Sequence, residues 1–77
     1  MYIILTHNGK KDQTAMAEQI ADMLEDDGHT IQHVVGSNDE EITLYTEDQQ
    51  VIGNFSKVPD PDTLRFYVDI ADENESN

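Results

Sequence analysis

Histidine is the residue type in this chain that could most readily bind a metal ion, because the 77 residues include three histidines and no cysteine. His29 and His33 lie on the same side of an expected strand. Four residues of extended chain separate them by about 13 Å, which is too far for one shared ion. His7 lies in an expected loop and has no Asp or Glu at ligand spacing beside it. The sequence therefore predicts no metal site.

Serines and carboxylates, the side chains that could act as nucleophiles or as acid–base catalysts, show no catalytic pattern. The serines lie in polar or terminal stretches, and none belongs to a glycine elbow. With 17 Asp and Glu residues, most of them expected at the surface, the sequence singles out no carboxylate pair for acid–base chemistry. We therefore expect no catalytic residue, no cofactor and a protein that is not an enzyme.

Acidic residues with helical spacing form the candidate partner-binding surface. Glu18, Asp22 and Glu25 follow one another at intervals of four and three residues, so they line one exposed stripe roughly 5–6 Å apart, opposite the apolar stripe. Asp26 extends this acidic surface. A row of carboxylates suits a basic protein surface, and the sequence predicts Glu18, Asp22, Glu25 and Asp26 as the residues that contact it.

Charges at the two ends of the expected helix, residues 13–27, oppose the helix dipole. Glu25, Asp26 and Asp27 crowd its C-terminal end, while Lys10 and Lys11 precede its N-terminal end. The dipole favours the reverse arrangement by about 0.3–1 kcal/mol per charge. Stability therefore does not explain these acids. Contact with a basic groove on another protein would explain them, and so would general acidity of the surface.

The whole chain is strongly acidic, with 17 acidic residues against four basic ones and a formal net charge of −13. Direct binding of nucleic acid is not expected, because a polyanion requires clustered Lys and Arg. Three interpretations of the acidity remain open. The surface imitates a nucleic acid or covers a basic groove, it is adapted to high salt, or it serves solubility alone.

A loop after the first expected strand suggests an alternative function. The strand at residues 3–5, the loop THNG at residues 6–9 and the run AEQIADMLEDDG at residues 17–28 form one unit. This unit, less than half of the chain, resembles the first half of flavodoxin-like proteins, in which that loop wraps a flavin phosphate with hydroxyls and backbone N–H groups. The resemblance implies a phosphate- or nucleotide-binding site at Thr6, Asn8, Gly9 and Thr14.

The first half of the chain predicts a strand, a helix and a second strand. Residues 2–5 are a continuous apolar run, typical of a central strand. In residues 13–27 the apolar side chains recur every three or four residues, with Asp12 or Thr14 as the expected N-cap and Gly28 as a left-handed C-terminal cap. Residues 30–35 form the second strand, and such a unit usually makes a right-handed parallel pair.

The second half predicts more strands. Residues 41–46 alternate between apolar and polar side chains, and residues 51–55 return as an antiparallel partner. Two prolines at positions 59 and 61 interrupt the sheet. Residues 64–70 then alternate with the clearest period of two in the chain, which predicts a fifth strand. A short helix that opens at Asp62 is the alternative.

These elements predict a single small α+β domain at residues 1–70, of order β-α-β-β-β-β, with one helix packed on a mixed four- to five-stranded sheet. Residues 71–77 are expected to be a flexible acidic tail. One helix cannot cover five strands, so Tyr45, Ile52 and Tyr67 are expected to form an apolar patch that supports a homodimer or binds a partner. With no membrane-length apolar run and no cysteine, the expected location is the cytoplasm, without membrane contact.

Charge and size together favour a small acidic, non-enzymatic binding protein. We expect an inhibitor or nucleic-acid mimic of the phage or mobile-element type, which acts on a basic protein surface such as that of a nucleic-acid-binding protein. The alternative function is the phosphate- or nucleotide-binding domain implied by the loop at residues 6–9.

Overall fold

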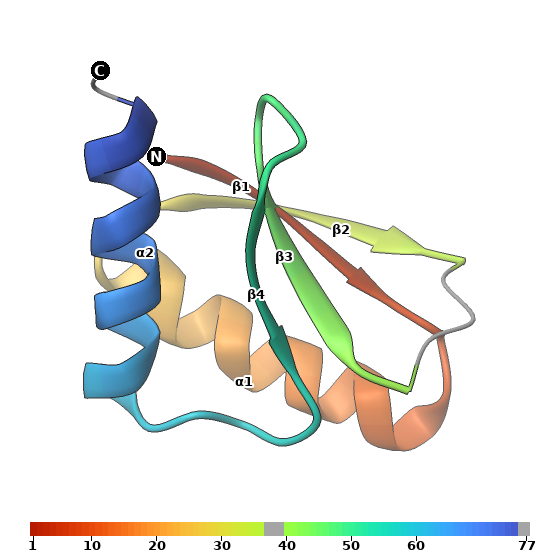
Figure 1. Ribbon diagram of the computed structural model, residues 1–77. Coiled ribbons are helices and arrows are strands. Elements are labelled where there is room, and N and C mark those ends of the chain that lie inside the picture. Colours follow the sequence, from red (N-terminus) through yellow and green to blue (C-terminus); the bar gives the residue numbers. More distant parts are fainter. Residues whose placement is uncertain (37–39, 76–77) are drawn as a thin grey trace.

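Six elements follow one another along the chain in the computed structural model, which describes residues 1–36 and 40–75. They are β1 (Tyr2–His7), α1 (Lys11–Asp26), β2 (Thr30–Val35), β3 (Ile42–Thr46), β4 (Val51–Phe55) and α2 (Pro61–Glu75). The strands form one four-stranded mixed sheet in the order β2-β1-β3-β4. The fold is therefore a small α+β domain of order β-α-β-β-β-α with two helices (Figure 1).

β1 lies inside the sheet, as its apolar run predicts. It pairs in parallel with β2, where Ile3 faces Ile31 and Leu5 faces His33, and it pairs antiparallel with β3 on its other side. A parallel pair needs a long crossover, and α1 supplies it. The predicted strand-helix-strand unit and the central position of β1 are both confirmed.

β3 and β4 form the predicted antiparallel hairpin. Gln49 adopts a positive φ of 68° in the connection, and its N–H donates to the Thr46 carbonyl at 2.9 Å. The pairing shifts by one residue between Leu44 and Tyr45, so β4 carries an irregularity of the bulge type there.

α1 buries the predicted apolar stripe: Ala17, Ile20, Ala21 and Leu24 are buried. At its C-terminal end Gly28 has the expected left-handed conformation, with φ of 92°. The Gly28 N–H donates to the Glu25 carbonyl and the His29 N–H to the Leu24 carbonyl, which is the Schellman arrangement.

The start of α1 differs from the prediction. The helix begins at Lys11, and Lys10 takes the N-cap position without a side-chain cap hydrogen bond. Neither Asp12 nor Thr14 caps it, so that prediction is wrong. The Thr14 hydroxyl instead donates to the Lys10 carbonyl at 2.9 Å, inside the first turn.

The predicted fifth strand is wrong, because residues 61–75 form α2. Pro61 stands at the first helical position, where its missing N–H is not needed. The helix buries Leu64 and Val68, which are four residues apart, and leaves Phe66 64% and Ile70 43% exposed. A strand would have placed all four on one face. α2 also includes residues 71–75 of the expected tail; the flexibility of that tail stays a prediction.

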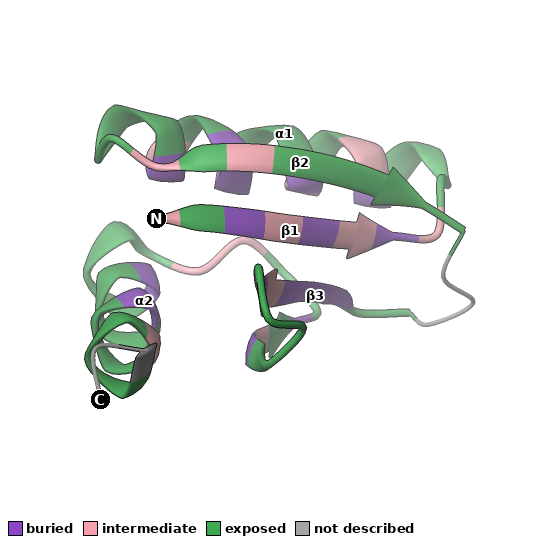
Figure 2. Cartoon of the chain, turned by 90° about the horizontal axis from the view of Figure 1, so that it is seen from above, coloured by how far each residue is buried: buried purple, intermediate pink, exposed green. Residues whose placement is uncertain are grey.

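Both helices pack against one face of the sheet. Side chains from α1, α2 and three strands form one buried cluster there, and the helices run in different directions, α1 along β1 and β2, and α2 beside β4 (Figures 1 and 2). The cluster comprises Ile3, Leu5, Ala17, Ile20, Ala21, Leu24, Ile42, Leu44, Ile52, Phe55, Leu64 and Val68.

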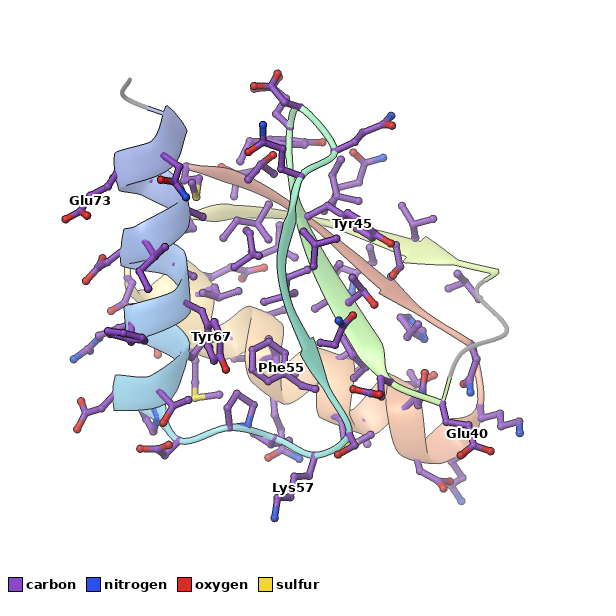
Figure 3. The ribbon with its side chains drawn as sticks, viewed as in Figure 1. Glu40, Tyr45, Phe55, Lys57, Tyr67 and Glu73 are labelled. Carbon is purple, nitrogen blue, oxygen red and sulfur yellow. The ribbon has the colours of Figure 1, made fainter. Side chains whose placement is uncertain are left out.

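The expected patch of Tyr45, Ile52 and Tyr67 is not formed. Ile52 is only 7% exposed and belongs to the core. Tyr67 lies on α2, where its ring packs edge to face against Phe55 with centroids 5.5 Å apart, whereas Tyr45 lies on β3, away from α2 (Figure 3). No helix within residues 1–36 and 40–75 has the length and apolar character that a membrane crossing requires.

Candidate partner-binding surface

The outward side of α1 carries the predicted acidic residues, called the acid row below: Glu18, Asp22, Glu25 and Asp26. Burial of Ile20 and Leu24 fixes the rotation of the helix, so these four side chains are exposed. Figure 2 shows that the side of α1 turned away from the sheet is mostly exposed. Successive members of the stripe are separated by about 4.5–6 Å along the helix axis. The structure therefore places all four predicted contact residues on one accessible element.

The acid row has no internal counter-charge. Within the described residues its four carboxylates make no hydrogen bond and no ion pair. Lys11, now the first residue of α1, lies seven residues before Glu18 and about 10 Å away along the axis, roughly one Debye length in physiological salt. The row is therefore solvated and accessible to a cationic partner.

Asp27, the third acid at the C-terminal end of α1, has a structural role. Its carboxylate accepts two hydrogen bonds from the Arg65 guanidinium of α2, at 3.1 Å from Nε and 3.2 Å from Nη2. These hydrogen bonds lower the pKa of Asp27 below its ordinary value of 3.8 and raise the pKa of Arg65. Arg65 is the single arginine of the chain. The pair links the two helices, so folding explains Asp27 but not the acid row.

Backbone N–H groups of the loop after β1 are already bonded within the protein. The Asn8 N–H donates to Gln13 Oε1, the Gly9 N–H to His7 Nδ1, and the Lys10 N–H to Asn8 Oδ1, at 2.9–3.1 Å. A phosphate would have to displace these contacts. These three N–H groups of the loop are therefore satisfied by side chains of residues 7–13.

Hydroxyl groups of the phosphate-binding candidates also point elsewhere. Thr6 donates to the Thr43 carbonyl at 3.3 Å, and Thr14 donates to the Lys10 carbonyl. Thr6, Asn8, Gly9 and Thr14 therefore do not converge on one set of free donors. The sheet is mixed, whereas flavodoxin-like sheets are mostly parallel. Phosphate binding stays a prediction, and the hydrogen bonds described here for residues 6–14 do not favour it.

Histidines lie in three different environments. His7 is buried at the end of β1 and His33 is exposed on β2. His29 is half-buried, and its Nδ1 has no hydrogen-bond partner within residues 1–36 and 40–75. Among the residues that the structure describes, no three His, Asp or Glu side chains gather closely enough to hold a metal ion.

A second surface is the sheet face opposite the helices, called the open face below. The sequence predicted an uncovered face with Tyr45 on it, but not the other side chains that share it. Strand register places ten uncharged side chains on it: Tyr2, Ile4, Thr6, Thr30, Gln32, Val34, Thr43, Tyr45, Val51 and Asn54. Polar contacts cross it, such as Tyr2 Oη to Gln32 Oε1 at 2.6 Å, and an open hollow is lined by Ile4, Val34 and Tyr45. The absence of charge was visible in the sequence, but the face that these side chains share was not.

Comparison of the chain with protein-family models, with curated proteins and with solved structures found no match.

Proposed function

We propose that this chain is a small acidic, non-enzymatic binding protein whose acid row contacts a basic surface of another protein, as an inhibitor or nucleic-acid mimic does. The observation that carries the proposal is the row itself, four exposed carboxylates on one side of α1 without a cationic partner in the described residues. Carboxylates spaced by one helical turn present regular negative charge to Lys and Arg side chains.

Placement of the row supports a role outside folding. Glu25 and Asp26 lie in the last turn of α1, which contains no basic residue, so both interact unfavourably with the helix dipole. Glu18, Asp22 and Asp26 are each four residues apart, and like charges at this spacing repel. A binding surface commonly carries residues that reduce stability, because function and stability make different demands on a site.

General acidity, from solubility or high-salt adaptation, is the competing explanation, and two variants separate it from a specific surface. The row variant carries Glu18→Gln, Asp22→Asn and Glu25→Gln. The control variant carries Glu40→Gln, Glu47→Gln and Asp48→Asn, which are exposed acids outside α1. Each variant removes three negative charges, from −13 to −10, so only the location differs.

Capture from a lysate of the native host tests the proposal, with the wild-type protein and both variants as baits and mass spectrometry as the readout. The proposal expects basic proteins that the wild type and the control variant retain and the row variant loses. Elution of these proteins by duplex DNA identifies a nucleic-acid-binding surface. Equal losses from the two variants, or no basic protein on the wild-type bait, would overturn the proposal.

A further inference from the structure

The outer edge of β2 carries main-chain groups without partners. The Thr30 N–H donates to the Met1 carbonyl at 3.0 Å and the Gly36 N–H to the His7 carbonyl at 3.2 Å, so even-numbered residues of this strand turn their main-chain groups toward β1. Because N–H and C=O of one strand residue point the same way, Ile31, His33 and Val35 turn theirs outward. Within the described residues nothing hydrogen-bonds to these groups.

This edge lacks the features that usually protect an edge strand. Its sequence, TIQHVV, contains no Lys, no Pro and no acidic residue, and every residue except Ile31 is exposed. The other edge strand, β4, contains Gly53, pairs with β3 through an irregularity and packs against α2. An unprotected edge with branched side chains is a template for another strand.

The absence of charge on β2 makes this edge suitable for a second copy of the chain. Two copies of a chain with a net charge of −13 repel each other at most orientations, but β2 has no acidic side chain, so pairing of two β2 strands places no carboxylate between them. A cationic segment would find no carboxylate on this strand. Two identical strands are also self-complementary in an antiparallel arrangement about a twofold axis.

We propose that two copies of this chain associate through antiparallel pairing of their β2 strands, with His33 opposite His33 of the second copy. Ile31 then faces Val35 of the other copy, and the reverse pair forms across the axis. All three outward-facing residues become hydrogen-bonded pairs, with about two hydrogen bonds in each pair. The two four-stranded sheets join into one continuous sheet.

This pairing does not rest on the proposed function. Salt is expected to strengthen the pairing and to weaken the binding of a basic protein to the acid row. The twofold axis is perpendicular to the sheet and keeps both α1 helices on the same side, so the two acid rows approach and repel each other. Raising NaCl from about 0.1 M to about 1 M shortens the Debye length from about 10 Å to about 3 Å. Self-association therefore tightens with salt, whereas binding of the acid row to a basic protein weakens.

Sedimentation equilibrium between about 10 μM and 1 mM protein, at low and high NaCl, tests the pairing. One six-residue seam is a small interface, so we expect a dissociation constant on the order of 100 μM at high salt. A mass that stays equal to one chain at 1 mM and about 1 M NaCl would overturn the proposal. Dimerisation that weakens with salt would equally contradict it.

Substitutions locate the seam. His33→Glu places two carboxylates opposite each other on the axis, so association is expected to fall by at least about tenfold. The matched control, Gln50→Glu, adds the same charge at an exposed position next to β4, at the opposite edge of the sheet, and is expected to change association by less than about threefold. Val35→Glu, at a residue 62% exposed, gives a second seam variant should His33→Glu fail to fold. A dimer that tolerates the folded seam variant does not use β2.

Discussion

Replacement of Leu64 by alanine is expected to destabilise the domain by about 3 kcal/mol, while Phe66→Ala on the same helix has little effect. Leu64 is 1% exposed and packs in the core, whereas Phe66 is 64% exposed. Leu→Ala removes three buried carbon atoms, whose burial contributes about 0.8 kcal/mol each. The cavity left behind adds a further cost, because the surrounding side chains relax only partly. Phe66→Ala removes mostly solvated surface, so we expect less than about 1 kcal/mol.

The contrast between the two variants tests the helical assignment of residues 61–75. In a strand, Leu64 and Phe66 would share one face and both substitutions would be costly. Urea denaturation followed by circular dichroism measures the free energy of unfolding, with the m-value as a check that both variants unfold from a comparable compact state. For a chain of this size, 3 kcal/mol corresponds to a fall in Tm of roughly 12–24 °C. Equal destabilisation, or a larger effect at Phe66, would refute the packing of α2 described above.

Three further predictions concern the loops and the charges of α1. Gly9→Ala is expected to lower the free energy of unfolding, measured by urea denaturation, by about 2 kcal/mol, because φ is +80° and the new Cβ would lie 2.9 Å from Val35 Cγ1. Gly28→Ala meets no atom within 4 Å, so it should lower the free energy of unfolding by only about 1 kcal/mol. Glu25→Gln should raise the free energy of unfolding by about 0.3–0.5 kcal/mol, because it removes a negative charge from the last turn of α1, and a loss of stability would contradict the dipole argument. The pKa of Asp27 is lowered by its hydrogen bonds with Arg65, so the pair stabilises the fold above pH 3.8 and this contribution disappears as the pH falls through the lower pKa of the folded state. Stability measured between pH 5 and about pH 2 should therefore fall less steeply in Arg65→Gln than in the wild type.

The strand-helix-strand unit could be predicted because its signals are local. The apolar run around Ile3 and Leu5, the stripe that includes Ile20 and Leu24, and Gly28 each favour one conformation only. Their agreement specifies the parallel pair and the direction of α1.

α2 was mispredicted because its apolar residues satisfy two periodicities. Leu64, Phe66, Val68 and Ile70 alternate as in a strand, while Leu64 and Val68 also have the spacing of four residues that a helix buries. Pro61 favours the helix as a first-turn residue. Tertiary contacts, including the Arg65 pair with α1, then stabilise the helix, and such contacts are invisible in local sequence.

Of the surface features, one could be predicted from local sequence and two could not. Spacing alone placed the acid row on one side of α1, since Glu18, Asp22 and Glu25 follow the helical repeat. The open face and the β2 edge depend instead on strand order. The residues of β2 alone do not predict that this strand lies at the edge of the sheet and β1 inside it.

Affinity of a captured basic partner for the wild type, the row variant and the control variant is the most direct test of a specific acidic surface on α1. Isothermal titration calorimetry at physiological salt measures all three under one condition. Three interfacial charges at about 0.7 kcal/mol each predict a loss of about 30-fold for the row variant and less than about threefold for the control variant. Equal losses for the two variants would contradict the account, because they would mean that net charge, and not the outward side of α1, attracts the partner.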